Sequence, residues 1–480
     1  MQGRIIRLIA AACAAATISV AAPSSALAVD LAVGCAGKTL TPADNIQTAI
    51  NAGGAGATFC FAPGTYRLQR QLWPRTDQTF IGGPGVLFKG SEVLTFQPQG
   101  NLWVSPGHTQ SPAPTTSKCT AAAGNLCNLP FRLYVDGKAL APVASLSELK
   151  PDTYYFDLAT DNVYVGSDPS GKLVELGLAA LGMSGTMSGV PAHGVEVSDI
   201  TWEQFGNMNN GVISTFAAEN WLIDGNEVRT SHGCGISGGT GAIVRNNFVH
   251  HMGQYGLCGQ GKNMVVENNE ISYNNTDGFD PRWDAGGTKW VNTTGLTVKN
   301  NYSHDNKGPG LWTDGNNLTT LYEGNRVERN TEEGIFHEIS YDAIIRNNTV
   351  LNNGRNVGTW GAGIMVSSSP NVQIYGNTVS GAWNAVSLVQ ENRGSGASGP
   401  YTLKNVTVSD NILSMRKGTT GVFDKTGTNV PFTSGTIKFV ANTYNLAVGD
   451  AWFSWAGQSL PRKSWQVLGM DKAGIFTLLK

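Results

Sequence analysis

Short apolar segments that alternate with polar residues recur along the chain from about residue 220. Examples are Ala242-Ile243-Val244 and Leu296-Thr297-Val298, each followed by a turn that ends in asparagine. The residue before that asparagine is Asn, Gly or Asp, and these residues tolerate the left-handed backbone of a tight turn best. The turn asparagines are Asn226, Asn247, Asn269, Asn301, Asn325, Asn348, Asn377 and Asn411. They lie 21, 22, 32, 24, 23, 29 and 34 residues apart. This spacing indicates one repeat of about 22 residues with insertions in its longer copies.

The repeat predicts an all-β solenoid. A short strand cannot bury its apolar face alone, but each coil of a stacked array buries that face against the coils above and below. Stacking identical turns also lets asparagine amides hydrogen-bond from one layer to the next. No α-helical period fits between the turns. We therefore expect a parallel β-helix.

A second pattern predicts the register of the coils. After each asparagine turn comes Gly or Ala and then an apolar residue, which we expect to point inward at the start of the next strand. The pairs are Gly235-Ile236, Gly256-Leu257, Gly278-Phe279, Gly310-Leu311, Gly334-Ile335, Gly363-Ile364 and Ala385-Val386. Alternation along the strands then predicts two outward rows that each cross three coils. These rows are Arg282, Asp314 and Glu338, and beside them Asp280, Trp312 and Phe336.

The N-terminus predicts export. Arg4 and Arg7 precede an apolar run over residues 8–22, and Ala26-Leu27-Ala28 has the small-residue pattern of a signal-peptide cleavage site. We expect cleavage after Ala28 and a secreted mature chain. Nothing later in the chain reaches the ~18 consecutive apolar residues that a membrane span needs, so no span is expected.

The cysteines predict disulfides. Of the 7 cysteines, Cys13 lies in the predicted signal peptide, and an even number remains in the mature chain. An even number in an exported chain is typical of oxidised pairs. Proximity pairs them most simply as Cys35–Cys60, Cys119–Cys127 and Cys234–Cys258. Zinc ligation is the alternative, but no C-x-x-C motif or His-Cys cluster supports it.

Composition and charge narrow the classes of function. The 480 residues include 35 Asp plus Glu and 33 Lys plus Arg, a formal net charge of −2. This balance gives no electrostatic reason to expect a nucleic-acid partner. The hydrophobic share of 41% is too large for a disordered chain. Charged residues are only 14% of the chain, against roughly 25% in ordinary globular proteins, so a local gathering of charges is informative.

Two N-terminal segments extend the pattern of the repeats. They are Asn45-Ile46-Gln47-Thr48-Ala49-Ile50 and Ala62-Pro63-Gly64-Thr65-Tyr66. Together with the asparagine repeats, they resemble the right-handed parallel β-helix proteins of the pectin-lyase-like superfamily, over about residues 40–440. The resemblance implies a single-stranded, right-handed solenoid whose open first coil is covered by a short helix. It also implies work on polysaccharides, of the polysaccharide lyase or glycoside hydrolase type.

Five segments follow from these patterns. They are residues 1–28, a signal peptide; 29–99, an N-terminal cap and first coils; 100–185, an inserted β-hairpin module; 186–440, the β-helix repeats; and 441–480, a C-terminal capping segment. The module contains the pair Cys119 and Cys127, and it either walls one edge of a groove or only decorates the first coil. Trp452 and Trp465 in the last segment are expected to pack over the C-terminal end.

Charged and aromatic residues gather on three consecutive predicted coils. The candidate catalytic residues are Asp280, Arg282, Lys289, Asp314, His337 and Glu338, and the candidate substrate-binding residues are Trp283, Trp312 and Phe336. Neighbouring carboxylates raise one another's pKa unless they pair with cations or bind a metal, and a carboxyl with a raised pKa can act as a general acid. The aromatic rings offer flat surface for sugar rings. The alternative is a set of solvated side chains and loop salt bridges.

The resemblance to superfamily lyases implies one reaction, β-elimination. Those lyases use Lys or Arg as the base beside calcium or another group that neutralises charge. By resemblance, Arg282 or Lys289 is the base, and Asp280, Asp284 and Asp314 bind Ca²⁺.

Other reactions stay open. Glycosidases of this fold use two or three carboxylates, here Asp280, Asp314 and Glu338, and the separation of the carboxylates decides inversion or retention. Mannuronan epimerases have the motif Asp-Pro-His-Asp, but this chain reads Asp280-Pro281-Arg282-Trp283, so uronate epimerase chemistry is disfavoured. A non-catalytic carbohydrate-binding or adhesin-like solenoid is the non-enzyme alternative. The expected partner is a polysaccharide, and the expected state is a monomer.

Overall fold

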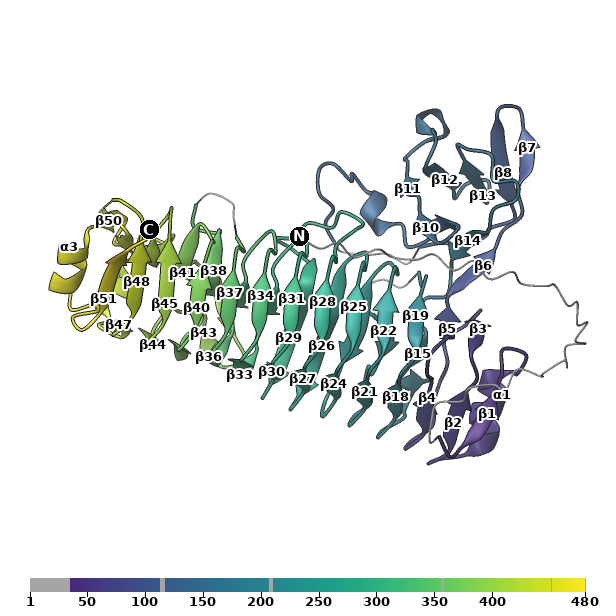
Figure 1. The fold of residues 1–480 in the computed structure, drawn as a ribbon, viewed down its shortest axis with the longest axis horizontal. Helices are drawn as coiled ribbons and strands as arrows, with labels where there is room; N and C mark the ends of the chain where they lie inside the picture. Colours follow the sequence, from purple (N-terminus) through teal and green to yellow (C-terminus); the bar gives the residue numbers. More distant parts are fainter. Residues whose placement is uncertain (1–34, 113–116, 207–209, 355–357, 450, 480) are drawn as a thin grey trace, which may run out of the picture.

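The computed structural model describes residues 35–479 except 113–116, 207–209, 355–357 and 450. The predicted signal peptide, residues 1–28, lies outside the described residues. Figure 1 shows a long solenoid whose coils follow one another along its axis, with the purple N-terminal coils and the yellow C-terminal coils at opposite ends.

Each coil contributes strands to three parallel rows. The first row, which carries the candidate site, consists of β15 (Met183–Ser184), β20 (Gly211–Ser214), β23 (Cys234–Gly238), β26 (Tyr255–Lys262), β29 (Gly286–Thr294), β32 (Leu311–Asp314), β35 (Ile335–Glu338), β38 (Ala362–Ser367), β41 (Asn384–Gln390), β46 (Thr420–Asp424) and β49 (Phe453–Trp455). The second row consists of β1 (Lys38–Leu40), β2 (Thr58–Phe61), β4 (Thr79–Ile81), β18 (Glu196–Ser198), β21 (Leu222–Asp224), β24 (Ile243–Arg245), β27 (Val265–Glu267), β30 (Thr297–Lys299), β33 (Leu318–Glu323), β36 (Tyr341–Arg346), β39 (Val372–Tyr375), β44 (Val406–Ser409) and β47 (Ile437–Val440).

The third row forms a separate sheet. It consists of β3 (Gly64–Arg67), β5 (Val86–Lys89), β19 (Thr201–Glu203), β22 (Glu227–Arg229), β25 (Phe248–His250), β28 (Glu270–Ser272), β31 (Tyr302–His304), β34 (Arg326–Glu328), β37 (Thr349–Leu351), β40 (Thr378–Ser380), β45 (Ile412–Met415), β48 (Thr443–Leu446) and β51 (Ile475–Leu478). The predicted all-β parallel solenoid is confirmed.

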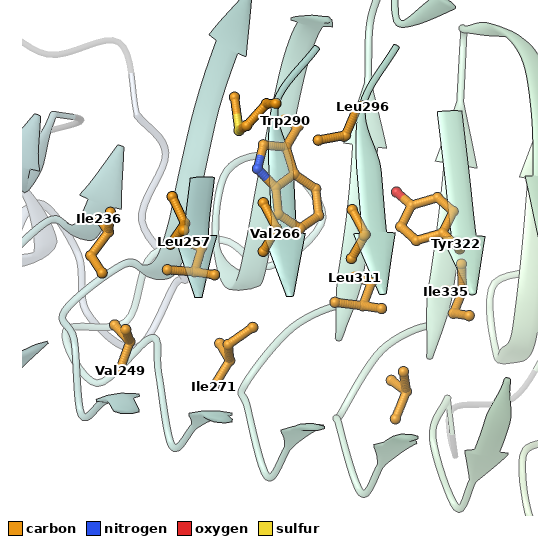
Figure 2. Packing of buried hydrophobic residues seen from close by; sticks show 14 of the residues in the cluster. Ile236, Val249, Leu257, Val266, Ile271, Trp290, Leu296, Leu311, Tyr322 and Ile335 are labelled. Carbon is orange, nitrogen blue, oxygen red and sulfur yellow. The ribbon is translucent and has the colours of Figure 1, made fainter. Parts of the chain in front are cut away.

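Inward residues of the three rows form one continuous core (Figure 2). Ile236, Leu257, Leu311 and Ile335 are fully or almost fully buried in the first row, as the Gly-apolar pattern predicts. Since side chains alternate along a strand, the residues between and after them face outward.

A ladder of asparagine amides stabilises one corner of the solenoid. Asn301 donates from its backbone nitrogen and its side chain to Asn325 Oδ1, at 3.0 and 3.1 Å, and Asn325 donates in the same way to Asn348 Oδ1, at 2.9 and 2.9 Å. All eight predicted turn asparagines take part, and the ladder continues through Asn442 to Asp471. A second ladder at the next corner joins Asn274, Asn306, Asn330 and Asn353.

Helices cover both ends. Helix α1 (Ile46–Gly53) begins at Asn45, whose side chain accepts from Thr48 N at 2.9 Å, and it buries Ile46 and Ile50, so the expected N-terminal helix is present. At the other end lie α2 (Val430–Thr433), α3 (Arg462–Val467) and β50 (Gln458–Leu460). Trp465 of α3 is fully buried and stacks on Phe453 with ring centroids 4.8 Å apart, as expected of a capping segment.

An antiparallel module stands off the solenoid near its N-terminal end (Figure 1). Its strands are β6 (Ser91–Val93), β7 (Gln97–Gln99), β8 (Leu102–Pro106), β9 (Leu133–Val135), β10 (Lys138–Ala139), β11 (Ala141–Pro142), β12 (Thr153–Asp157), β13 (Asn162–Val165) and β14 (Val174–Gly177). The module therefore runs over residues 91–177 and begins earlier than the expected segment 100–185, because β6 pairs with β14. Its own core contains Leu133, Tyr154 and Leu176.

Three disulfides join Cys35 to Cys60, Cys119 to Cys127 and Cys234 to Cys258, which confirms the predicted pairing. Disulfides persist in oxidising compartments, so the protein belongs outside the cytoplasm. No helix among the described residues is long and apolar enough to cross a membrane.

Candidate functional site

A pocket of about 660 Å³ lies over the outward face of the first row. Three insertions surround it, and they account for the three longest repeat spacings, 32, 29 and 34 residues. Residues 275–285 precede strand β29, and residues 358–361 precede strand β38. Residues 391–405 follow β41 and contain the small hairpin β42 (Ser395–Gly396) and β43 (Gly399–Pro400). The insertions supply Trp283, Trp360 and Arg393 to the pocket wall.

The register confirms one part of the predicted alignment and corrects another. Leu311 pairs with Ile335, so Asp314 pairs with Glu338. Phe279 was expected to start the preceding strand, and this is wrong. The strand of that coil is β29, in which Trp290 pairs with Thr313. The insertion shifts Phe279 and the following Asp280–Asp284 segment into a loop, so Lys289 takes the position beside Trp312.

Lys289 links two carboxylates at the floor of the pocket. Its Nζ lies 2.9 Å from Asp314 Oδ2 and 3.3 Å from Asp284 Oδ1, and it donates to the backbone oxygen of Trp283 at 2.6 Å. It also lies 3.9 Å from the ring centroid of Trp312. The ammonium is therefore held by opposite charges on both sides.

Asp284 has further donors. Tyr255 donates a short hydrogen bond to Asp284 Oδ1. Gln254 Nε2 lies 3.2 Å from Asp284 Oδ2, and Ser117 Oγ lies 3.3 Å from the same oxygen. Asp284 thus joins β26, the inserted module and the loop before β29. Burial, followed by the charge of Asp284, raises the pKa of Tyr255 well above its usual value, so the phenol stays protonated.

Glu338 is the strongest candidate for a proton donor. Burial and, after it, the neighbouring charge of Asp314 raise its pKa to about 7, although Arg393 opposes the shift. Arg393 NH1 lies 2.5 Å from Glu338 Oε1, and Trp312 Nε1 donates to Glu338 Oε2 at 3.3 Å. A carboxyl with this pKa carries its proton under mildly acidic to neutral conditions.

Glu332 and Glu333 line the same pocket, at the point where the chain enters β35. Glu333 is only 4% exposed, and its Oε1 has no hydrogen-bond partner within the described part of the chain. Burial, with the charges of Glu332 and Glu338, raises the pKa of Glu333 well above its ordinary value. Arg282 Nε lies 3.9 Å from Glu332 Oε2 at the rim.

His337 does not reach the pocket. It points into the solenoid beside Thr313, whose hydroxyl lies 2.8 Å from His337 Nδ1, and it is fully buried. Burial lowers its pKa to about 3, so the ring is neutral. This placement gives no support to the catalytic role predicted for His337, because alternation in β35 sends the residue inward with Ile335.

The aromatic row is present, but its ring faces are covered. Trp312 and Phe336 stack on each other with centroids 5.6 Å apart, and Trp360 meets Phe336 edge-on. Trp312 is only 2% exposed, and Lys289 lies over its ring. Trp283 at the rim is 49% exposed, with Lys118 Nζ 3.6 Å from its ring centroid. Trp312 and Phe336 therefore form an apolar wall of the pocket. Their ring faces are not exposed as the flat surface for sugar rings that the sequence predicts.

The three acids expected to bind calcium contact other groups of the protein. Asp280 Oδ1 accepts from the backbone nitrogen of Arg282 at 3.0 Å, and Asp284 and Asp314 both face Lys289. The ammonium thus provides the positive charge that a metal would supply. Within the described residues, no three His, Cys, Asp or Glu side chains are grouped to hold a metal ion.

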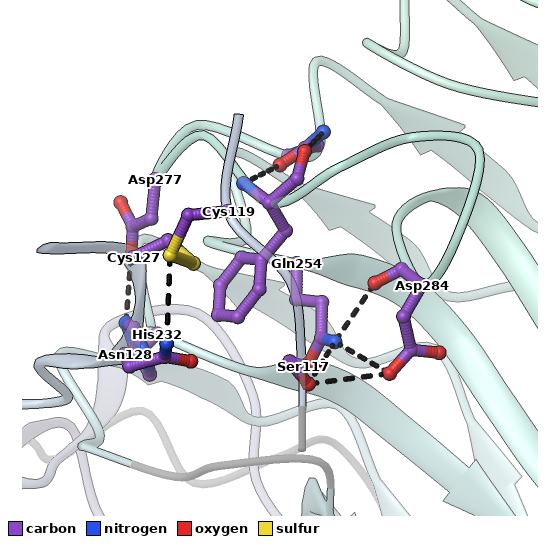
Figure 3. Close-up of a disulfide and its surroundings, with 10 residues drawn as sticks. Ser117, Cys119, Cys127, Asn128, His232, Gln254, Asp277 and Asp284 are labelled. Carbon is purple, nitrogen blue, oxygen red and sulfur yellow. Dashed lines mark hydrogen bonds and ion pairs between the residues drawn. A yellow bond between two sulfur atoms is a disulfide. The ribbon is translucent and has the colours of Figure 1, made fainter. Parts of the chain in front are cut away.

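The module borders this site. Its segment around Cys119–Cys127 pairs with the loop before β29, through a bridge from Cys119 to Phe279 and a hydrogen bond from Asp280 N to Lys118 O at 2.8 Å. Figure 3 shows this disulfide and, on the other side of Gln254, Asp284 with its contacts to Gln254 and Ser117. These contacts agree with the hypothesis that the module forms one edge of the groove.

Several pocket residues were not identified from the sequence. They are Glu332, Glu333, Trp360, Glu391 and Arg393. Tyr255, which contacts Asp284 from the adjoining pocket, was not identified either. The long repeat spacings could have indicated the insertions that carry Trp360, Glu391 and Arg393. Glu332 and Glu333 lie directly before the Gly334-Ile335 pair and thus before strand β35. Alternation along a strand therefore does not predict where their side chains point.

Comparison with known proteins identifies the fold. Residues 210–379 match the family model described as the right handed beta helix region. The solved complex of XylC with xylose has a TM-score of 0.64 at 14% identity, covering 90% of this chain and 82% of that one. The A-module of the mannuronan C-5 epimerase AlgE6 from Azotobacter vinelandii (TM-score 0.49, 16% identity, 91% and 95% coverage) and a glycoside hydrolase (0.43, 10%, 91% and 99%) are also similar.

No curated protein matches the chain. The protein is thus a right-handed parallel β-helix, a fold that it shares with XylC.

Proposed function

We propose that the protein is a secreted glycoside hydrolase that cleaves a polysaccharide, with Glu338 as the general acid and Asp314 as the nucleophile. The pairing of these two residues on adjacent strands at the floor of the pocket carries the proposal. Hydrolysis of a glycosidic bond needs one protonated and one ionised carboxyl. The raised pKa of Glu338, about 7, and the contact of Asp314 with Lys289 suit these two roles.

The chemistry runs in two steps. Glu338 gives its proton to the leaving oxygen as the bond from that oxygen to the anomeric carbon breaks, and Asp314 forms a bond to the same carbon. A water molecule then gives a proton to Glu338 and bonds to the anomeric carbon, which releases Asp314. Lys289 orients Asp314 through their 2.9 Å contact.

The register favours retention of the anomeric configuration. Neighbouring parallel strands lie about 4.8 Å apart, and both side chains leave the same face. Retaining glycosidases hold their carboxyls about 5 Å apart, whereas inverting enzymes need roughly 6.5–9.5 Å to admit a water molecule.

The same contacts argue against β-elimination. A lyase base must be free to accept a proton, but Lys289 Nζ already contacts two carboxylates. Arg282 is 65% exposed at the rim, and its guanidinium keeps its proton at any ordinary pH.

The test is release of reducing ends over a panel of polysaccharides, measured beside the absorbance of unsaturated uronides. Glu338→Gln and Asp314→Asn are each expected to lower kcat/KM by about 10³-fold. The wild-type kcat/KM is expected to fall as the pH rises through about 7, where Glu338 loses its proton. NMR of the first product gives the anomer.

The exposed module residues Asp152 and Glu148 offer matched controls, as Asp152→Asn and Glu148→Gln. Unsaturated uronide as the product would contradict the proposal in favour of β-elimination. Binding of sugar without any turnover would identify the non-catalytic carbohydrate-binding alternative.

A further inference from the structure

Acidic side chains outnumber basic ones in the lining of the pocket, although the raised pKa values of Glu333 and Glu338 reduce the negative charge that these two contribute. The lining includes six carboxyl groups and three cations, namely Asp284, Asp314, Glu332, Glu333, Glu338 and Glu391 against Arg282, Lys289 and Arg393. An adjoining pocket of about 550 Å³ shares Asp284 and Lys289 and adds one acid, Glu219, with no further cation. Acidic side chains therefore outnumber basic ones in both pockets.

Two of the three cations of the pocket are already engaged. Lys289 contacts Asp284 and Asp314, as described above. Arg393 NH1 contacts Glu338 Oε1 at 2.5 Å and Glu391 Oε2 at 3.2 Å. Arg282 is exposed at the rim, with its Nε 3.9 Å from Glu332 Oε2. Inside the pocket, a carboxylate on a substrate would thus meet paired cations and an excess of acidic side chains.

Glu333 points to the kind of group that the pocket receives. It lines the cavity and is 4% exposed, yet its Oε1 lacks a hydrogen-bond partner among the residues that the structure describes. Buried polar atoms are normally paired, so the free oxygen indicates a partner that arrives with the ligand. A sugar hydroxyl both donates and accepts, and it can pair with a carboxyl in either protonation state.

We infer that this pocket takes a neutral sugar unit and rejects uronic acids, and that Glu333 binds one of its hydroxyls. The inference rests on the proposed function and specifies its substrate class. The stacked Trp312 and Phe336 supply the apolar part of the wall. Like charges placed opposite each other disfavour the wrong partner, and this gives the site its selectivity.

The first experiment compares substrates that differ only in the oxidation of C6. The pairs are β-1,4-linked oligosaccharides of glucan and glucuronan, and of mannan and mannuronan, with xylan and arabinan oligosaccharides as further neutral members. We expect at least a 100-fold higher kcat/KM for the neutral member of a pair that is cleaved, and a smaller ratio at high salt because screening weakens the repulsion.

Equal or faster hydrolysis of the uronate member would overturn the substrate class and leave the hydrolase intact. Absence of cleavage and of binding across the whole panel would overturn the proposed function, and the inference would fall with it. The two failures are therefore distinguishable.

The second experiment examines Glu333 directly. Glu333→Ala is expected to raise KM for the neutral substrate about tenfold, the typical effect of one buried hydrogen bond, with kcat nearly unchanged. Glu333→Gln keeps a donor and an acceptor, so its KM is expected to stay within about threefold of wild type.

If Glu333→Ala does not fold, Glu333→Met preserves the volume without the hydrogen bond and takes its place. Glu148→Gln in the module is the matched control. An unchanged KM in a folded Ala or Met variant would contradict the assignment of Glu333.

Discussion

At the scale of single residues, the electrostatics of the site depend on the position of the Lys289 side chain between Asp284 and Asp314. The ammonium is shared between Asp284 and Asp314, so any change on the Asp284 side alters what Asp314 and Glu338 experience. Tyr255 donates to the Asp284 oxygen that Lys289 also contacts, and it packs beside the disulfide Cys234–Cys258. We therefore regard Tyr255 as a positioning residue that acts through Asp284.

Tyr255→Phe removes only the hydroxyl. Asp284 then loses a donor and attracts Lys289 more strongly, which weakens the contact of Lys289 with Asp314. Because Lys289 lowers the pKa of Glu338, that pKa is expected to rise further, and the alkaline limb of the pH–rate profile should move to higher pH. We expect kcat to fall about five- to tenfold, in line with one lost hydrogen bond, with little change in KM. A lower melting temperature with an unmoved alkaline limb would mean that Tyr255 has only a structural role.

Alternation along the strands is enough to predict the pairing of Asp314 with Glu338 from the sequence. The same argument fails for Asp280 and Arg282, because the insertion moves Phe279 off the strand and brings Lys289 into the row. Glu333 and Arg393 could not be predicted in this way. They come from the ends of insertions and coils, where strand periodicity gives no direction.

At the scale of elements, a buried cluster of charges fixes the module to the solenoid. Glu175 of β14 is fully buried, and its carboxylate lies 2.9 Å from Lys89 Nζ on β5 and 2.7 Å from Arg67 on β3. Lys89 also contacts Glu203 of β19 at 3.0 Å. The module therefore joins the third row through ion pairs, in addition to its contact near Cys119.

Glu175→Ala is expected to lower the free energy of unfolding by about 3–5 kcal/mol at pH 7, since it leaves Lys89 buried with one partner fewer. Burial alone would raise the pKa of Glu175, but hydrogen bonds from Lys89 and Arg67 outweigh it and lower the pKa below 4.5. The stabilisation is therefore present above pH 4.5 and is lost as the pH falls through the lowered value.

Urea denaturation of wild type and Glu175→Ala at pH 7 and at pH 3 measures this difference, with the exposed Glu148→Ala as control. A difference between the two proteins that does not shrink in acid would contradict the account of the ion pairs.

The elements themselves were largely predictable. Each turn asparagine accepts hydrogen bonds from the coil before it and donates hydrogen bonds to the next coil. The ladder therefore requires asparagine at the same position of every coil, and this repeat is visible in the sequence. The insertions and the module have no repeat, so their strands and boundaries, such as the start at β6, depend on tertiary pairing that the sequence does not display.

At the scale of the whole molecule, a solenoid is most exposed at its ends, where a last coil offers unpaired strand edges and apolar core to solvent. Asp471 closes the asparagine ladder at the C-terminal end. It accepts from Asn442 N at 3.0 Å and Asn442 Nδ2 at 2.9 Å, from Tyr444 at 2.7 Å and from Trp465 at 3.1 Å. This one carboxylate therefore ties the last coil to the capping helix α3.

Asp471→Ala is expected to lower the free energy of unfolding by about 3–5 kcal/mol, because it leaves several buried donors without an acceptor. We expect a lower melting temperature and self-association in size-exclusion chromatography as the end of the solenoid opens, while the pocket, which no described residue of the capping segment lines, retains its KM in the folded fraction. Asp471→Asn keeps one acceptor for Asn442 and should lose less stability than the alanine variant. If both variants remain as stable and as monodisperse as the wild type, α3 does not depend on Asp471 to protect the end of the solenoid, and the apolar stacking of Trp465 on Phe453 must be sufficient.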